Sequence, residues 1–413
     1  MRRTFRALRN RNYRLFWFGQ LVSLCGSWMQ TTAIAWLVLK DLHAGGTVLG
    51  LVVAVQFLPT LVGGSWAGVI ADRFDKRRIL LGTQSFMALS AGTMAVLTLT
   101  GTVTLWMVFA LAAAMGMATM FDNPTRQAFV TEMVGPDDLA NAVGLNSAGF
   151  NVARILGPAI AGILIATAGT GICFALNAGS FIAVIGGLAA MRTQDLYRAA
   201  PVAKAKGQIR EGLRYALSVP ELRMALGLLA VVGTFAMNFT VLIPLVAKNL
   251  FHGNASTLGW LTAVMGVGSL IGALFVASRA RPTPGLLASA AIALGVLMCA
   301  AAVAPTLAWE YLAFAFTGVA AISFMSTCNA TVQLASRPDM RGRVMALYMV
   351  LFLGSTPVGG PIVGWVGQHF GAQWSLALGG VPSILVGLVA GRLLLRRRAE
   401  ARTVPLLPEA LTA

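Results

Sequence analysis

The main chemistry that this chain offers is ion pairing, and its densest source is the stretch Gly68-Val-Ile-Ala-Asp72-Arg73-Phe-Asp75-Lys76-Arg77-Arg78. One long apolar segment ends in this stretch, and another begins at Ile79. The hydrocarbon core of a bilayer accepts neither unpaired backbone groups nor bare charges, so the stretch is expected in water between two membrane helices. Its excess of Lys and Arg is typical of a cytoplasmic loop.

Arg154 lies near the middle of another apolar segment. An arginine at the centre of a membrane helix costs about 2.5–3.5 kcal/mol on insertion scales, so other groups must stabilise it. Candidate partners are backbone carbonyls, water in a cavity, Asn151 on the same helical face, or an anionic group of a bound molecule. Two interpretations stay open: a structural arginine tied to asparagine side chains, and a cavity residue that touches a substrate or affects a gate.

A polar stripe follows the first apolar segment. Steps of three and four residues place its members on one face of a helix. Such a stripe lines either a water-filled cavity or a polar helix contact, and we favour the cavity. Asn151 and Arg154 are candidates for the same cavity. The members of the stripe are Gln20, Ser23, Ser27 and Gln30.

No pattern in the sequence is typical of an enzyme. His43, His252 and His369 fall in expected loops, and the four cysteines lie inside apolar segments without metal-ligand spacing. The phosphate-binding pattern Gly-x-x-x-x-Gly-Lys-[Ser/Thr] is absent, which disfavours transport driven by ATP. We therefore expect no enzymatic activity, no metal and no cofactor.

The composition is that of an integral membrane protein. Apolar residues make up 57% and charged residues 11%, whereas about one quarter of the residues in a soluble domain are charged. Of the 31 Lys and Arg residues, only Lys40, Lys248 and Arg154 lie outside the segments expected on one side of the membrane. This asymmetry predicts a cytoplasmic (inner) membrane location with both termini in the cytoplasm, and it explains the charge of +17 without a nucleic-acid partner.

About 20 apolar residues are needed to cross a bilayer, and twelve segments qualify. We expect an all-α membrane protein with two bundles of six transmembrane helices: residues 1–191, and residues 224–413 with a short tail. A cytoplasmic linker, residues 192–223, joins the bundles and contains an amphipathic helix near 208–217. The expected spans are 13–39, 46–71, 79–100, 104–122, 139–167, 170–191, 224–247, 256–278, 284–304, 307–330, 344–367 and 373–395.

Several motifs resemble the major facilitator superfamily. Gly68-x-x-x-Asp72-Arg73-x-x-Lys76-Arg77-Arg78 resembles its signature between spans 2 and 3, and Arg154-Ile-Leu-Gly157-Pro158-Ala-Ile-Ala-Gly162 resembles its antiporter motif in span 5. Three stretches resemble the drug:proton antiporter branch with macrolide-efflux and enterobactin-export proteins: Pro124-x-Arg126-Gln-Ala, Glu211-Gly-Leu-Arg-Tyr215 and Arg341-Gly-Arg343-Val-Met345. The chain departs from the family at Asp75, where a glycine is usual, and in span 4, where it has no arginine within 104–122.

The charged loop can act as a latch. Asp72 could pair with Arg73 or Arg126, or lie against the positive N-terminus of the helix that begins near Val344. Such contacts would exist only while the two bundles are closed on the cytoplasmic side. The alternative is that the basic residues only set topology. The candidate gating residues are Gly68, Asp72, Arg73, Arg77 and Arg126, and the candidate antiporter motif is Arg154, Gly157, Pro158 and Gly162.

The resemblance implies a secondary active transporter, a monomer in the bilayer, that exports a small amphipathic compound such as a drug or a siderophore in exchange for protons. Candidate proton-coupling residues are Asp72, Asp122 and Glu132, because no carboxylate is expected at mid-depth in a span. Two alternatives remain: an importer or uncoupled facilitator, and a membrane sensor or assembly partner that does not transport.

Overall fold

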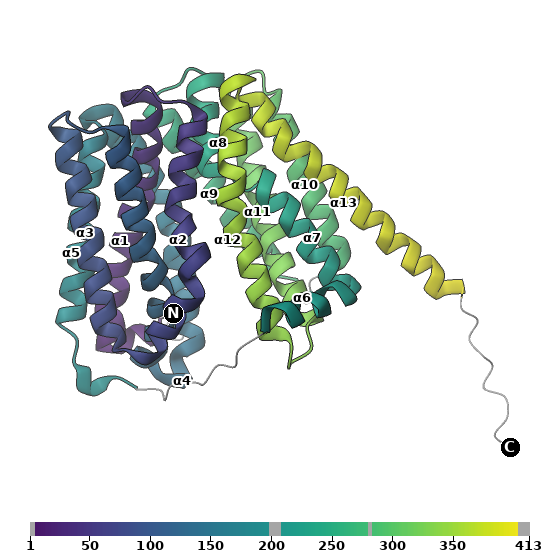
Figure 1. The fold of residues 1–413 in the computed structure, drawn as a ribbon, viewed down its shortest axis with the longest axis horizontal. Helices are drawn as coiled ribbons and strands as arrows, with labels where there is room; N and C mark the ends of the chain where they lie inside the picture. The colour runs from purple at the N-terminus through teal and green to yellow at the C-terminus, as the bar shows by residue number, and fades with distance from the viewer. Residues whose placement is uncertain (1–4, 198–207, 280–282, 404–413) are drawn as a thin grey trace.

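A computed structural model describes residues 5–197, 208–279 and 283–403, and every regular element in these ranges is a helix (Figure 1). Helices α1 to α5 pack as the N-terminal bundle and helices α7 to α13 as the C-terminal bundle, with α6 between them in the chain. The elements are η1 (Arg6–Arg9), α1 (Arg11–Trp36), η2 (Leu37–Asp41), α2 (Gly46–Arg73), α3 (Lys76–Leu99), α4 (Leu105–Ala168), α5 (Thr170–Ala189), η3 (Thr193–Asp195), α6 (Gln208–Ser218), α7 (Pro220–Phe235), α8 (Phe239–Leu245), η4 (Val246–Leu250), α9 (Ala255–Ala277), α10 (Pro284–Ala302), α11 (Leu307–Ala335), α12 (Arg341–His369) and α13 (Ala372–Thr403).

Helix α4 is two membrane helices in one. Its 64 residues would span roughly 96 Å as a straight helix, about three times the hydrocarbon core. The helix reverses at Gly135, whose φ of 70° is outside the helical region, and Pro136 follows directly. Of the eleven helices in the described residues that could cross a membrane, α4 therefore supplies two crossings. The expected all-α fold with twelve transmembrane helices is confirmed.

The fourth span continues further than expected. The expected end at residue 122 is wrong, because the helix runs on through Arg126 to the reversal at Gly135. Arg126 therefore lies on the helix that continues from the fourth span. Asp122 and Arg126 are four residues apart in this helix, and they form an ion pair.

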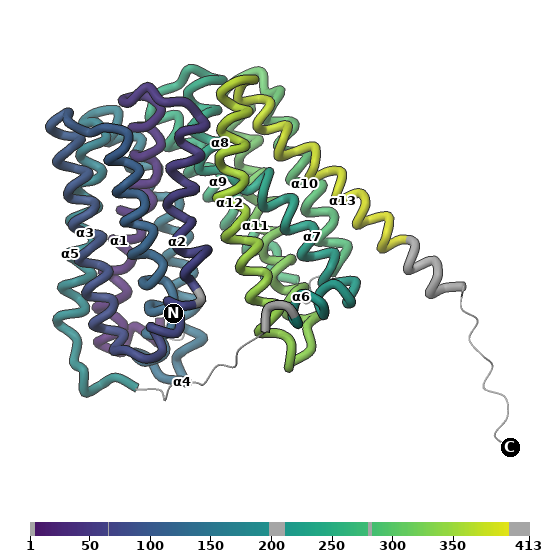
Figure 2. The backbone as a smooth tube through the Cα atoms, in the orientation of Figure 1, coloured from purple at the N-terminus to yellow at the C-terminus, as the bar shows by residue number. Residues whose placement is uncertain are grey.

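The two ends of the molecule differ in charge. We call the end that carries Arg73, α6 and Arg337 the basic end, and the end that carries residues 42–45, 251–254 and 303–306 the far end. Figure 1 shows the bundles adjoining at the far end and lying apart toward the basic end, and the backbone trace in Figure 2 shows the same divergence.

The linker helix α6 lies against the C-terminal bundle at the basic end. Glu211 forms an ion pair of 2.8 Å with Arg343 at the start of α12. The hydroxyl of Tyr215 accepts a hydrogen bond of 3.1 Å from the backbone N–H of Arg337. The part of the expected linker within 198–207 lies outside the described residues.

Glycines allow the bundles to approach closely at the far end. A Cβ atom on Gly50 would lie 2.3 Å from the carbonyl oxygen of Gly360, so α2 and α12 touch through backbone. A Cβ atom on Gly259 would lie 2.8 Å from the Cα of Gly162, so α9 and the second half of α4 also touch. Only residues without side chains permit such crossings.

All hydrogen bonds found between the bundles in the described residues lie at the far end. The Thr47 N–H donates to the side-chain oxygen of Gln368 at 3.1 Å, and the Ser256 hydroxyl donates to the Gly162 carbonyl at 3.3 Å. The ammonium of Lys248 donates to the carbonyl of Leu39. The structure is therefore closed at the far end and open at the basic end.

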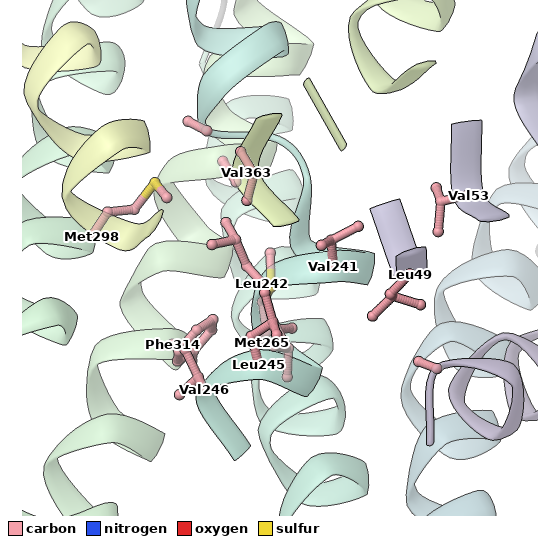
Figure 3. Packing of buried hydrophobic residues seen from close by; sticks show 14 of the residues in the cluster. Leu49, Val53, Val241, Leu242, Leu245, Val246, Met265, Met298, Phe314 and Val363 are labelled. Atoms are coloured by element: carbon pink, nitrogen blue, oxygen red, sulfur yellow. The ribbon is translucent and has the colours of Figure 1, made fainter. Parts of the chain in front are cut away.

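Apolar packing supports the same contact. One buried cluster contains Leu49 and Val53 of α2 together with Val241 and Leu242 of α8. Figure 3 shows these side chains across the junction of the two bundles. Polar bonds, glycine crossings and apolar packing thus hold one end of the molecule closed.

Adding one methyl group at the glycine crossing should destabilise the protein. We expect Gly50→Ala to cost roughly 1–3 kcal/mol, because the new Cβ meets a backbone carbonyl that cannot turn aside. The matched control is Gly179→Ala, where a Cβ would meet nothing within 4 Å. Melting temperatures in detergent should fall only for Gly50→Ala, and equal values for both variants would contradict the tight crossing.

Candidate binding cavity and charged clusters

A cavity of about 660 Å³ lies between the two bundles. The N-terminal bundle supplies most of its lining, and Thr240 and Phe352 complete it from the C-terminal bundle. Aromatic residues, methionines and uncharged polar side chains alternate around it, with a single charged residue, Arg126, among the described lining residues. The polar lining residues are Gln20, Ser23, Ser27, Gln30, Thr31, Gln56, Gln84, Thr119, Asn123, Arg126, Gln127, Asn177 and Thr240.

The structure brings the whole polar stripe of α1 to the cavity wall. Packing of α1 against α5 holds it there, because a Cβ on Gly26 would lie 2.4 Å from the side-chain oxygen of Asn177. The Asn177 amide donates a 2.6 Å hydrogen bond to the Gln30 side-chain oxygen and accepts one of 3.0 Å from Ser180. The residues of this stripe therefore both line the cavity and bind a neighbouring helix. Substrate binding by the stripe remains a prediction.

Arg154 and Asn151 are not among the residues that line this cavity. Asn151 donates a 2.8 Å hydrogen bond to the carbonyl of Ser147 in its own helix. The Arg154 guanidinium lies 5.8 Å from the centre of the Trp28 ring. Within the described part of the chain no carboxylate pairs with Arg154, so a cation–π contact, worth about 0.5–2 kcal/mol, helps to stabilise it.

The glycines and proline of the candidate antiporter motif set two helix contacts. A Cβ on Gly157 would lie 2.6 Å from the Cβ of Trp28, so α1 packs directly against this part of α4. The carbonyl of the next residue, Pro158, and Gly162 about one turn later face Gly259 of α9. The motif therefore joins the polar stripe in one bundle to the far-end contact with the other.

Asp122 is fully buried within a network of hydrogen bonds next to the cavity. It accepts hydrogen bonds from the hydroxyl of Thr83 at 2.9 Å and from the amide of Gln84 at 2.7 Å, and it pairs with Arg126. Gln84 and Arg126 both line the cavity. A change in the charge of Asp122 would therefore act directly on two side chains that a bound molecule can touch.

Glu132 lies nearer the basic end and already has a cationic partner. Its carboxylate forms a 2.7 Å ion pair with Lys76, and both side chains are mostly buried. Arg77 donates to the carbonyls of Leu188 and Ala189 at the end of α5, at 2.7 and 3.1 Å. These bonds place the positive charges of the loop against the negative end of a helix.

The latch residue Asp72 is half-buried at the end of α2, one turn after Gly68. In the described residues it forms no ion pair with Arg73 or with Arg126, which binds Asp122 instead. Arg73 is exposed. The bundles are apart at this end, and the closed latch remains a prediction from the sequence.

Several lining residues were not singled out from the sequence. Asn123 and Gln127 fall in what the sequence suggests is a loop, and Thr119 stands alone in its apolar segment. With the helix continued to residue 134, their spacing of four places all three on one face with Arg126 close by. Recognition that Asp122 and Arg126 form an i, i+4 pair could have revealed this face.

Two six-helix membrane bundles around a polar central cavity define a transporter of the major facilitator type. A family model described as "Transmembrane secretion effector" matches residues 2–411, and the chain belongs to this major facilitator family. The multidrug efflux pump Tap of Mycolicibacterium fortuitum is 30% identical over 393 residues, which cover 91% of this chain and 94% of the relative. The predicted family is confirmed, and the chain is a multi-pass membrane transporter rather than an enzyme.

Two further similarities extend over the chain. Macrolide efflux protein A of Streptococcus pyogenes is 23% identical over 386 residues, which cover 90% of this chain and 93% of the relative. A solved bacterial homologue of the human lysosomal transporter Spinster, described as inward-facing and unoccupied, has a TM-score of 0.75 at 14% identity. That similarity covers 94% of this chain and 98% of the other, and it shows the fold.

The pair between Lys76 and Glu132 should be structural. We expect Glu132→Gln to lower stability by about 3 kcal/mol, because Lys76 is left without its partner in a mostly buried position. The double variant Lys76→Met/Glu132→Gln should recover much of the loss, since neither charge remains. Melting temperatures of Lys76→Met, Glu132→Gln and the double variant test this prediction. Additive losses of stability would show that the two residues act independently.

Proposed function

We propose that the protein exports a small amphipathic compound across the cytoplasmic membrane by proton antiport with alternating access. The observation that carries the proposal is the cavity of about 660 Å³ between two bundles that are joined at one end and apart at the other. Its volume suits a drug-sized molecule. The printed names of the relatives, a multidrug efflux pump and a macrolide efflux protein, support export.

The chemistry of the lining supports an amphipathic substrate. Phe57, Phe150 and Phe352 offer apolar rings, while Met87 and Met115 offer side chains that adapt to different shapes. Amides and hydroxyls from α1, α3 and α4 supply hydrogen bonds without a fixed net charge. A wall of this kind binds lipophilic molecules with a few polar groups rather than a highly charged metabolite.

The charge distribution supports an orientation with the basic end in the cytoplasm. The loop at 73–78, the described end of the linker at 208–223 and residues 337–343 all lie at this end and are rich in Arg and Lys. The open end of the structure would then face the cytoplasm, where substrate enters. Export requires a second state in which the far end opens and the basic end closes.

We assign proton coupling to Asp122 among the three candidate carboxylates. Glu132 is held by Lys76, and Asp72 belongs to the latch, whereas Asp122 is linked to the cavity through Gln84 and Arg126. Protonation of Asp122 would release Arg126 and change the cavity wall, while ionised Asp122 would hold Arg126 in place. This linkage lets a proton and a substrate compete without direct contact.

Transport assays in liposomes test the proposal directly. A lipophilic fluorescent dye and the internal pH should move in a coupled manner under an imposed pH gradient, with dye and protons travelling in opposite directions. Dye movement that is the same with and without the gradient would favour an uncoupled facilitator. Binding of several candidate compounds without any flux would favour a sensor.

Asp122→Asn should separate dye movement from proton movement. The variant keeps a side-chain oxygen for Thr83 and Gln84 but cannot exchange a proton, so we expect downhill dye flux without coupled change of internal pH. Asp137→Asn, at an exposed acidic residue of the same bundle, serves as the control. Normal proton coupling in Asp122→Asn would remove Asp122 from this role.

Asp72→Asn should abolish transport without loss of stability. Asp72 has no bonded partner in the described residues of the open state, so the melting temperature should match that of the wild type. Transport should fall to the level of empty liposomes, because closing the basic end would lose its latch. Asp195→Asn, at an exposed position of the same end, is the control, and undiminished transport by Asp72→Asn would refute the latch.

A further inference from the structure

A second groove, separate from the central cavity, lies between α7 and α13 of the C-terminal bundle. Its volume is about 360 Å³, and apolar side chains from the two helices form most of its walls. Figure 1 shows α13 diverging from α12 toward the basic end. None of the residues that line this groove lines the central cavity, so a substrate in that cavity does not account for it.

The groove is open along its length and has free space in its floor. Val389 and Leu393 of α13 are 57% and 51% exposed, and a Cβ atom on Gly227 of α7 would meet nothing within 4 Å. The wall on α7 runs from Pro220 to Leu228, roughly 12 Å along the helix axis. A groove of this length and volume fits an extended hydrocarbon chain and is too small to seat a helix about 10 Å across.

Helix α6 indicates that one end of the groove lies at the membrane surface. This helix ends at Ser218, and α7 begins two residues later at Pro220, which lines the groove. One face of α6 is bonded to the C-terminal bundle, whereas Leu213, Arg214 and Leu217 are exposed. Exposed leucines beside an arginine are typical of a helix that lies between headgroups and acyl chains. The end of the groove at Pro220 is therefore expected at headgroup depth, and we call it the mouth.

The mouth of the groove is rich in positive charge. Arg223 lines the groove and is exposed, and the exposed Arg392 of α13 comes directly before the lining residue Leu393. Helix α7 begins without a side-chain cap, so the positive end of its dipole also lies here. Glu221 lines the same region but already interacts with another residue. Basic residues beside an apolar groove between membrane helices suit a ligand with an anionic head and an apolar chain.

We propose that this groove binds an anionic phospholipid, with one acyl chain between α7 and α13 and the phosphate beside Arg223. The lipid comes from the leaflet that the basic end faces. The proposal does not depend on the proposed function, because it requires only that the chain spans a membrane. Two other occupants, a zwitterionic phospholipid and a second copy of this chain, are distinguished by the experiment.

Native mass spectrometry of the full-length protein in detergent tests the choice of lipid. Phosphatidylglycerol and phosphatidylcholine with identical acyl chains are titrated separately. The wild type should retain one phosphatidylglycerol, and it should bind phosphatidylcholine about fivefold more weakly, the factor expected for one arginine near an anionic headgroup. Equal affinity for the two lipids would overturn the proposal.

Two variants test the position of the lipid. Gly227→Leu places a side chain in open space within the groove, so it should fold and lose retention of both lipids. Gly186→Leu, at an exposed glycine of α5 that also has nothing within 4 Å, is the matched control. Arg223→Gln should lower the affinity for phosphatidylglycerol to that for phosphatidylcholine, whereas Arg78→Gln, at an exposed position of the other bundle, should keep the difference.

Melting temperatures give an independent measurement. A ligand that binds only the folded state stabilises it, so phosphatidylglycerol should raise the melting temperature of the wild type and of Gly186→Leu but not that of Gly227→Leu. Unchanged lipid retention by Gly227→Leu would overturn the proposal. A protein dimer that Gly227→Leu prevents would overturn it as well, because the groove would then seat a second copy. Neither measurement involves dye transport, so a failure of proton antiport would leave the lipid site standing.

Discussion

The structure depends on one constraint, which is that a charge inside the bilayer must find a partner or lose its charge. The N-terminal bundle meets this constraint by pairing. Asp122 binds Arg126 and two neutral donors, Lys76 binds Glu132, and the Arg154 guanidinium lies near the ring of Trp28. Each arrangement joins different helices or different turns of one helix, so satisfying the charge also fixes how the bundle packs.

Close approach of helices is the second feature that holds the structure together. The hydrophobic effect does not drive helices together within lipid, because lipid tails are as apolar as the side chains. Membrane helices therefore associate through tight packing and polar contacts. At the far end, Gly50 with Gly360 and Gly162 with Gly259 bring backbones together over two pairs of helices. The cavity lies where the bundles diverge beyond these crossings, and polar side chains from several helices form its wall.

Much of the architecture was predictable because it rests on local rules. Span length, the bias of Lys and Arg, and the three-and-four spacing of the stripe from Gln20 to Gln30 each follow from single segments. The fourth span was not predictable in the same way. A charged residue such as Arg126 indicates a loop unless its partner on the same helix is recognised. The burial of the acidic residue Glu310 in α11 depends on neighbours that are distant in sequence.

The two buried carboxylates show how the same constraint gives different chemistry in the two bundles. Asp122 is buried with a cation and two hydrogen-bond donors around its carboxylate. Glu310 is fully buried, and within the described part of the chain neither of its carboxylate oxygens has a hydrogen-bond partner. The two bundles therefore hold a buried carboxylate in opposite ways, one with bonded partners and the other with none in the described residues.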